Sequence, residues 1–290
     1  MTTSRRQLAR LPFLAPLLAA CSPVNLVNAL TPRGGYTVSR DIRFLEGDRG
    51  TLDLYTPEGA NDTTPVVVFF YGGGWKDGSK DSYRFLAQSL TSLGMVVAVP
   101  DYRLYPEVRW PTFLEDAAAA TRFLQTGPAA NRPMVIMGHS AGAFIVGALA
   151  TDPRWLGRAS RKVLRGAIGL AGPYDFQPDE ADYVAIFRDA PGGRARVLPT
   201  EPGDLAGCPP TLLLHGLADD TVAPERSREL ARSLRAANIP VTLREYPDVG
   251  HIGIIGALAA PVRGLGLAGG PVRDDVAAFL DTVVPRGKPA

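Results

Sequence analysis

A serine between two glycines stands where a predicted strand meets a predicted helix. Gly138, Ser140 and Gly142 follow the apolar run 134–137 and open the small-residue run 141–150. A serine on such a turn has its hydroxyl lifted clear of the sheet. The glycines remove Cβ atoms that would collide where strand and helix converge. Ser140 could also be an ordinary helix cap, since serine is favoured there, but the pattern predicts a nucleophile.

A serine hydroxyl needs a neighbouring base, and the usual base is an imidazole with a pKa near neutrality. The chain has three histidines. His139 lies inside the serine turn, where we expect it to point away from Ser140, and His215 ends a predicted strand and is expected to be structural. His251, in a loop after the strand-like run 241–246, is therefore the predicted base, with an ordinary loop histidine as the alternative.

An orienting carboxylate should follow another strand. Asp219 comes shortly after the predicted strand 211–215, although Asp220 is adjacent and Asp175 also follows a strand. With Asp219 as the acid, the order along the chain is nucleophile, acid, base, each just past a strand. That is the order of the α/β-hydrolase triad.

A glycine-rich segment could supply the remaining chemistry. The buried-strand pattern 66–70 ends in Tyr71, three glycines and Trp75. Attack on an ester creates a tetrahedral oxyanion, which preorganised backbone N–H groups stabilise. We assign Gly73, Gly74 and the N–H of Ala141 as the expected donors.

These motifs, taken together, resemble the carboxylesterase group of the α/β-hydrolases related to hormone-sensitive lipase. The resembling segments run from about residue 50 to 284 and are residues 71–75, 101–107, Pro111, Glu115-Asp116, the serine turn, and the Asp219 and His251 loops. The family normally has histidine where this chain has Tyr71, so the resemblance implies that Tyr71 replaces it as a hydrogen-bonding strut for the glycine loop. We also expect Arg103 to pair with Glu115 or Asp116 as part of the scaffold.

Other ligand classes do not fit the pattern. A dinucleotide fingerprint from Gly72 would need glycine at Asp77, and a phosphate loop from Gly73 would need lysine at Ser79. The three scattered histidines and Cys208 do not have the spacing of a metal-ligand cluster. The chain has 31 basic and 29 acidic residues, which does not suggest nucleic-acid binding. We therefore expect no cofactor, no metal and no nucleic-acid partner.

The N-terminus is typical of an exported chain. A basic segment with Arg5-Arg6 precedes ten apolar residues, 11–20, which predicts a signal peptide over 1–20. The ending Leu18-Ala19-Ala20-Cys21 resembles the bacterial lipoprotein box, which implies lipidation of Cys21; a buried small hydrophobe is the alternative reading. The paired arginines resemble a twin-arginine signal but also fit an ordinary basic region. Ser22, directly after this cysteine, favours delivery of the lipidated chain to the outer membrane over retention in the inner membrane. We therefore expect the protein on the periplasmic side of the outer membrane of the cell envelope.

The rest of the chain reads as a short tether and one catalytic domain. Residues 21–35 are the expected lipidated tether, and 36–290 the domain; only Cys208 remains after lipidation, so no internal disulfide is possible. Strand and helix patterns alternate as a mostly parallel sheet flanked by helices requires. Predicted strands are 36–46, 51–55, 66–70, 95–99, 134–137, 163–170, 211–215 and 241–246; predicted helices are 81–93, 111–125, 141–150, 224–237 and 272–284.

Specificity is expected where this alternation breaks. Residues 174–210 are rich in Pro, Asp and Gly, and insertions here in the resembling fold form a cap over the serine. We take Trp75, Phe176, Phe187 and Ile252 as substrate-binding candidates, although the apolar run 252–258 reads more readily as a buried helix than as a pocket wall. Short, apolar acyl groups are the expected substrates.

The sequence therefore predicts a serine carboxylesterase that acts on a small-molecule ester, with membrane attachment through Cys21. An amidase of the arylformamidase kind is the nearest alternative, because the same site in related enzymes cleaves activated amides. A binding module without activity is a more distant alternative. The sequence leaves the oligomeric state open.

Overall fold

The centre of the molecule is a sheet of eight strands. The computed structural model describes residues 23–174, 181–190, 198–199 and 205–284. The strands lie in the order β1-β2-β4-β3-β5-β6-β7-β8. β2 runs antiparallel to β1 and β4, and all other neighbours are parallel. The strands are β1 (Tyr36–Arg43), β2 (Thr51–Pro57), β3 (Val66–Phe70), β4 (Val96–Pro100), β5 (Met134–His139), β6 (Leu164–Leu170), β7 (Thr211–Gly216) and β8 (Val241–Tyr246).

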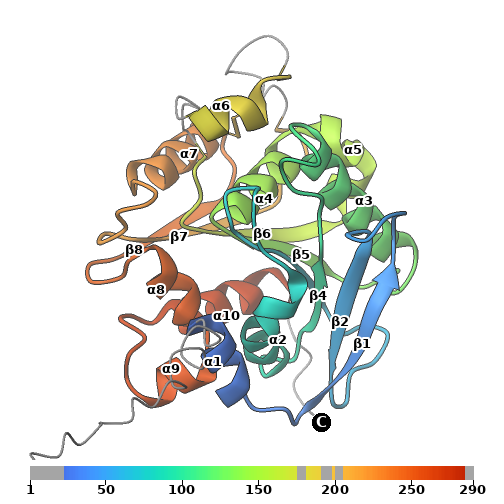
Figure 1. Cartoon of the computed structure of the whole chain (residues 1–290), viewed down its shortest axis with the longest axis vertical. Helices are drawn as coiled ribbons and strands as arrows, with labels where there is room; N and C mark the ends of the chain where they lie inside the picture. Colours follow the sequence, from blue (N-terminus) through green and yellow to red (C-terminus); the bar gives the residue numbers. More distant parts are fainter. Residues whose placement is uncertain (1–22, 175–180, 191–197, 200–204, 285–290) are drawn as a thin grey trace, which may run out of the picture.

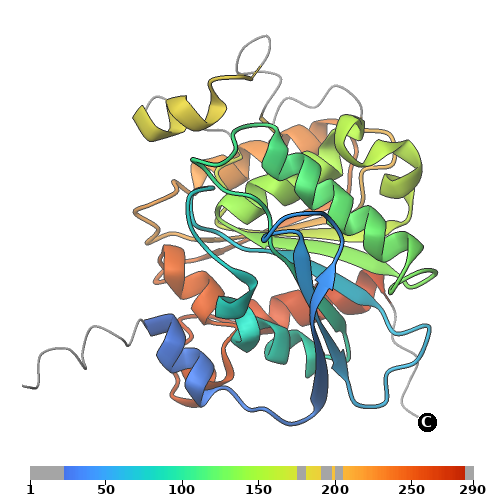
Figure 2. The same ribbon diagram turned by 45° about the vertical axis from the view of Figure 1, so that its right-hand side comes forward.

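Helices cover both faces of this sheet (Figures 1 and 2). One face carries α3 (Thr112–Thr126), α4 (Ala141–Thr151), α5 (Pro153–Lys162) and α7 (Glu225–Ala236). The other carries α1 (Pro23–Leu30), α2 (Arg84–Thr91), α8 (His251–Gly256), α9 (Ala260–Gly264) and α10 (Val272–Val283). The mostly parallel sheet between two helical layers confirms the predicted fold class.

Sequence pattern explains the layers. The strands β3, β4, β5 and β7 are buried along their whole length, as expected for parallel strands covered on both faces. Helix α4 is also fully buried, because it packs on β3, β5 and β6 beneath α3 and α5. By contrast α7 buries only Ser227, Leu230, Ala231 and Leu234, the i, i+3, i+4, i+7 face of an amphipathic helix.

Several elements differ from the sequence prediction. The predicted helix 81–93 is divided into a 3-10 turn, η1 (Lys80–Tyr83), and α2, because the Ser79 hydroxyl accepts from the Asp81 N–H and starts the turn early. Helix α5 was not predicted: it buries only Leu156 and Arg161 and is kinked at Gly157, so it has few apolar core positions to indicate a helix. Helix α9 was also missed. His251 begins α8, whereas the prediction placed it in a loop.

The cap region is described only in part. Its helix α6 (Ala181–Phe187) lies above the sheet on the side of α7 (Figure 1). The N–H of Trp110 donates to the carbonyl of Ile186 at 2.9 Å, which attaches α6 to the body of the domain. Phe176, a predicted substrate contact, lies outside the described residues.

Part of the expected tether is helical. Residues 23–30 form α1, which contacts η1, α2 and α9. Cys21 and the predicted signal peptide lie outside the described residues. Among the residues that the structure does describe, no helix has the length and apolar character needed to span a membrane.

Candidate active site

The serine turn joins β5 to α4 at the carboxyl edge of the sheet. Ser140 has φ 53°, a left-handed conformation that is uncommon for a residue with a side chain. A Cβ on Gly138 would stand 2.3 Å from the Gly142 carbonyl oxygen, and one on Gly142 would stand 2.0 Å from that of Phe70. Both glycines are therefore required by close backbone approach. The Ser140 side chain makes no cap hydrogen bond to α4, so it does not act as an ordinary helix cap.

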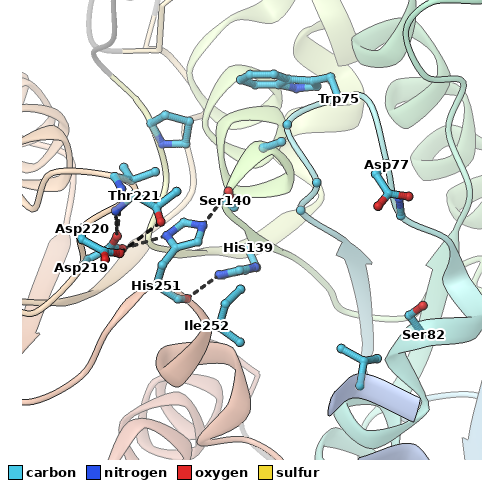
Figure 3. Close-up of a pocket in the computed structure, with 18 of the residues that line it drawn as sticks. Trp75, Asp77, Ser82, His139, Ser140, Asp219, Asp220, Thr221, His251 and Ile252 are labelled. Atoms are coloured by element: carbon cyan, nitrogen blue, oxygen red, sulfur yellow. Dashed lines mark hydrogen bonds and ion pairs between the residues drawn. The ribbon is translucent and has the colours of Figure 1, made fainter. Parts of the chain in front are cut away.

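Ser140, His251 and Asp219 form a continuous hydrogen-bonded chain (Figure 3). Ser140 Oγ lies 2.9 Å from His251 Nε2, and His251 Nδ1 lies 2.9 Å from Asp219 Oδ2. Because a carboxylate can only accept, Nδ1 carries the proton, and Nε2 is left to accept from the serine hydroxyl. Both His251 and Asp219 are buried. This is the relative arrangement of nucleophile, base and orienting acid.

The loop after β7 fixes which carboxylate faces the histidine. Asp219 Oδ1 accepts from the N–H groups of Thr221 and Val222 at 3.0 and 2.8 Å, which leaves Oδ2 for His251. Burial alone would raise the pKa of Asp219, but the hydrogen bonds from Val222 and His251 outweigh it and hold this pKa below its usual value. The side chain of Asp220 is exposed. Asp175, the other alternative, lies outside the described residues.

His215 supports the same loop. Its Nδ1 lies 2.7 Å from Ser227 Oγ, and its Nε2 lies 2.9 Å from the Val222 carbonyl oxygen. The side chain is completely buried, and burial lowers its pKa. His215 thus ties the Asp219 loop to α7, in keeping with the structural role expected from the sequence.

His139 contacts the histidine of the triad, which the sequence did not suggest. Its Nε2 lies 3.0 Å from the His251 carbonyl oxygen, and the two imidazole rings are 4.9 Å apart (Figure 3). Since a carbonyl can only accept, Nε2 of His139 carries the proton. Burial, and next the neighbouring His251, lower the pKa of His139 to about 3. A neutral His139 therefore holds the backbone of His251 in place.

The glycine segment after β3 crosses the cleft next to the serine. A Cβ on Gly72 would stand only 2.9 Å from Ser140 Cβ. Gly73 has φ 123°, and a Cβ there would stand 2.1 Å from the Asp77 carbonyl oxygen, so the loop folds tightly on itself. The three predicted oxyanion donors, Gly73, Gly74 and Ala141, all line the cleft with Ser140. The first N–H groups of a helix, such as that of Ala141 in α4, have no acceptor within the helix.

A buried hydrogen-bond network supports this loop from below. The Tyr71 hydroxyl donates to Asp101 Oδ1 at 2.7 Å and accepts from Arg49 Nη2 at 2.6 Å. The same guanidinium nitrogen donates to the Gly78 carbonyl at 2.7 Å. The strut expected of Tyr71 is thus present, and Arg49, from the turn between β1 and β2, is the member that the sequence did not reveal. Arg103 pairs with Asp116 at 2.6 Å and not with Glu115.

The cleft around Ser140 has a volume of about 1040 Å³. Two predicted substrate contacts line it, Trp75 and the exposed Ile252 of α8. Phe187 does not: it is buried behind Trp75, with ring centroids 5.0 Å apart. Tyr183 of α6 and Val24 of α1 are lining residues that the sequence analysis did not single out.

The segment 252–258 serves both of the functions considered from the sequence, which favoured a buried helix over a pocket wall. Ile254, Ile255, Ala257 and Leu258 are buried, whereas Ile252 faces the cleft. Within the described residues, no three His, Cys, Asp or Glu side chains are grouped so that they could hold a metal ion.

Comparisons with known proteins agree with this geometry. The family model described as BD-FAE matches residues 52–156, and that of the prolyl oligopeptidase family matches residues 195–260. The first match includes the glycine loop and Ser140, and the second includes Asp219 and His251.

Among individual proteins, kynurenine formamidase of Danio rerio is 26% identical over 74% of this chain and 75% of its own length. Esterase LipC of Mycobacterium tuberculosis is 27% identical, over 74% of this chain and 60% of its own length. This chain therefore spans about three-fifths of the second relative.

A thermostable esterase from Pseudomonas putida has a similar solved structure. Its TM-score is 0.70 at 21% identity, and the match covers 91% of this chain and 89% of that one. This likeness shows the α/β-hydrolase fold. Together with the fold, the relatives indicate a serine hydrolase of the carboxylic ester hydrolase type.

Proposed function

We propose that the protein is a serine carboxylesterase whose nucleophile is Ser140. The observation that carries the proposal is the uninterrupted chain from Ser140 Oγ through His251 to Asp219, with 2.9 Å at each step, at the floor of an open cleft. No other described serine stands on a strained strand-to-helix turn with a histidine nitrogen at its hydroxyl.

The geometry supports a two-step reaction. Ser140 Oγ attacks the ester carbonyl carbon while His251 Nε2 takes its proton, and the carbonyl oxygen becomes an oxyanion facing the N–H groups of Gly73, Gly74 and Ala141. When the ester bond breaks, the proton on Nε2 passes to the leaving alcohol. Water then attacks the acyl-enzyme, gives its proton to His251, and releases the acid and Ser140.

The shape of the cleft supports a preference for short acyl groups. Trp75 forms one wall beside the glycine loop, and the rings of Phe113, Phe144 and Phe187 fill the space behind it. A long chain directed to this side would have to displace that aromatic cluster. Short esters need no such rearrangement.

The test is a series of p-nitrophenyl esters from acetate to octanoate, with the chain that starts at Ser22 and its Ser140→Ala variant. We expect activity that falls with acyl length and is lost in the variant. A fluorophosphonate probe should label the parent chain and not Ser140→Ala. Equal activity in both proteins would refute Ser140 as the nucleophile, and absence of both activity and labelling would favour the binding-module alternative.

An arylformamidase activity is the second candidate, because kynurenine formamidase of Danio rerio is similar over three-quarters of its length. The same triad can attack an activated amide. Phenyl formate and formanilide differ only in the leaving group, so kcat/KM for the two separates the candidates. A preference for formanilide would replace the esterase assignment.

The predicted export and lipidation are proposals about where this chemistry takes place. They are supported by the basic and apolar segments before Cys21 and by Ser22 after it. Metabolic labelling with palmitate should modify the full-length chain and not its Cys21→Ala variant. Membrane fractionation should then place the full-length protein with the outer membrane.

A further inference from the structure

Helix α1 is fixed to the domain by its inner face. Asn28 Nδ2 donates to the Ser82 carbonyl at 2.8 Å, and Asn28 Oδ1 accepts from the Phe85 N–H at 3.0 Å, at the start of α2. Val27 packs against the hydrophobic core, and Val24 lines the active-site cleft. Polar and apolar contacts together therefore fix the orientation of α1. The same contacts determine which of its residues lie on the outer face.

That outer face is apolar. Leu26 and Leu30 are 54% and 60% exposed, and residues four apart lie on the same side of a helix. A second apolar pair, Leu265 and Leu267, is 71% and 70% exposed and directly follows α9. Because α1 contacts α9, the two pairs belong to the same corner of the molecule, below the sheet in Figures 1 and 2.

The two segments that carry these leucines contain no acidic residue, although Asp274 of α10 interacts with Arg263. Between residues 22 and 35 the only charged residue is Arg33, and between 252 and 270 it is Arg263. Charged residues make up 21% of the whole chain, so two segments with no acid are unusual within it. Exposed leucines on segments whose only charged residues are arginines match the interface of an anionic bilayer, which takes up apolar side chains and attracts cations.

We propose that Leu26, Leu30, Leu265 and Leu267 form a lipid-binding surface that lies in the interface of an anionic membrane. The chain that precedes α1 supports this occupant, since Cys21, the predicted lipidation site, comes two residues before Pro23. An acyl chain attached there would enter the membrane at the same corner. The folded domain would then lie on the membrane in one orientation and would not hang from a loose tether.

The orientation has a consequence for the substrate, which rests on the proposed function. Val24 of α1 and Ile252 of α8 both line the cleft, and Ile252 is 66% exposed. The mouth of the cleft therefore borders the lipid-binding surface. An amphiphilic ester dissolved in the membrane could reach Ser140 without crossing a thick aqueous layer.

The experiment measures vesicle binding by the chain that starts at Ser22. Every described element begins at or after Pro23, so this chain keeps the whole fold, and circular dichroism checks it. Co-sedimentation uses vesicles of phosphatidylethanolamine and phosphatidylglycerol. We expect each of the double variants Leu26→Asn/Leu30→Asn and Leu265→Asn/Leu267→Asn to weaken partitioning about tenfold, from the loss of buried apolar area. Neutral phosphatidylcholine vesicles should bind the parent chain several-fold more weakly.

Val163→Asn/Val184→Asn is the matched control, because Val163 and Val184 are comparably exposed but lie on the α5 and α6 side of the molecule (Figure 1). It should bind like the parent chain. The proposal is overturned if the parent chain does not bind vesicles, or if the control loses as much binding as the leucine variants. It is also overturned if sedimentation velocity shows that the leucines join two copies of the chain and vesicles play no part.

An activity measurement separates this proposal from the esterase proposal. All variants should hydrolyse soluble p-nitrophenyl acetate at the parent rate, because none of the four leucines lines the cleft. On decyl acetate carried in vesicles, which joins a short acyl group to an alcohol that dissolves in the bilayer, the leucine variants should be slower in proportion to their lost binding. Vesicle binding without activity on any ester would leave the surface intact and refute the esterase alone.

Discussion

The guanidinium of Arg49 donates to the Tyr71 hydroxyl at 2.6 Å and, through the same nitrogen, to the Gly78 carbonyl at 2.7 Å. Tyr71 and Gly78 stand at the two ends of the glycine loop that crosses the cleft beside Ser140. One side chain from a distant hairpin thus holds both ends of the loop. Arg49 is a positioning residue in this arrangement, since it touches the loop and not the cleft.

Replacement of Arg49 by methionine is expected to lower kcat about 10- to 100-fold and to change KM little. The reason is that hydrogen bonds from a charged group contribute about 1.5–3 kcal/mol, and here they hold the loop whose N–H groups we propose as donors for an oxyanion that exists only during reaction. Steady-state kinetics with p-nitrophenyl acetate check this. The affinity of a boronic acid, which mimics the tetrahedral state, should fall in parallel with kcat.

Arg43→Met is the matched control for Arg49. Arg43 lies in the same hairpin, but within the described part of the chain its side chain donates only to the carbonyls of Leu45 and Gly47. The Arg43→Met variant should lose some stability and keep the kcat of the parent protein. If both variants lose kcat equally, the hairpin as a whole matters, and the assignment to Arg49 is wrong.

His139 offers a pair of variants that separates its hydrogen bond from its bulk. Glutamine can still donate to the His251 carbonyl, whereas leucine cannot, so His139→Leu should lose about tenfold in kcat and His139→Gln should recover most of it. The estimate corresponds to the roughly 1 kcal/mol that one hydrogen bond contributes. Equal losses in the two variants would mean that packing against the His251 ring, and not the donor, is important.

The same histidine affects stability in acid. Its folded pKa of about 3 lies below the ordinary value of 6.5, so between these pH values the unfolded chain binds a proton that the folded chain does not. Stability therefore falls as the pH falls, by up to about 1.4 kcal/mol per pH unit from this group. Urea unfolding between pH 6.5 and 4 should show a shallower fall in His139→Gln. A slope unchanged from the parent would show that His139 titrates normally.

Asp219→Asn is expected to reduce kcat by the order of a thousandfold, because an amide in this place favours the wrong tautomer of His251. Asp220→Asn is its control: among the described residues, this exposed neighbour accepts only from the Thr221 hydroxyl, and the variant should be fully active. In the parent protein, the lowered pKa of Asp219 contributes stability that is present above pH 3.8 and is lost as the pH falls further. If Asp220→Asn is the inactive variant, the acid has been misassigned.

How well a feature could be predicted from the sequence depended on how far apart along the chain its interacting residues lie. The sheet followed from local patterns, since buried parallel strands are short, nearly continuous runs of apolar residues. Ser140, Asp219 and His251 could be proposed because each directly follows a strand, and parallel strands end at one edge. Arg49 could not, because nothing in the sequence of a hairpin turn indicates that its side chain reaches Tyr71 and Gly78.

Three further features depended on packing that no local pattern encodes. The helix α1 was read as a tether because residues 22–35 contain proline, asparagine and glycine, yet Asn28 uses its side-chain amide to attach it to α2. His139 was expected to point away from the serine, and its hydrogen bond to the His251 carbonyl joins residues 112 positions apart, which no local pattern indicates. Phe187 was expected to line the cleft, but its ring packs behind Trp75 instead.

Tyr183 should limit the size of the substrate on the side of the glycine loop. Its hydroxyl stands 3.6 Å from the place that a Cβ on Gly74 would occupy, and its ring meets Trp75 edge-on at 6.0 Å. Tyr183→Ala should therefore extend the acyl length that is hydrolysed and lower kcat/KM for acetate by about 5- to 10-fold, as contacts of the order of 1 kcal/mol are lost. Val184→Ala, a change of the neighbouring outward-facing residue, should leave the acyl-length profile unchanged. A Tyr183→Ala profile that falls off at the same acyl length as the parent would mean that α6 does not bound the acyl site, and Trp75 would then be the wall that sets its size.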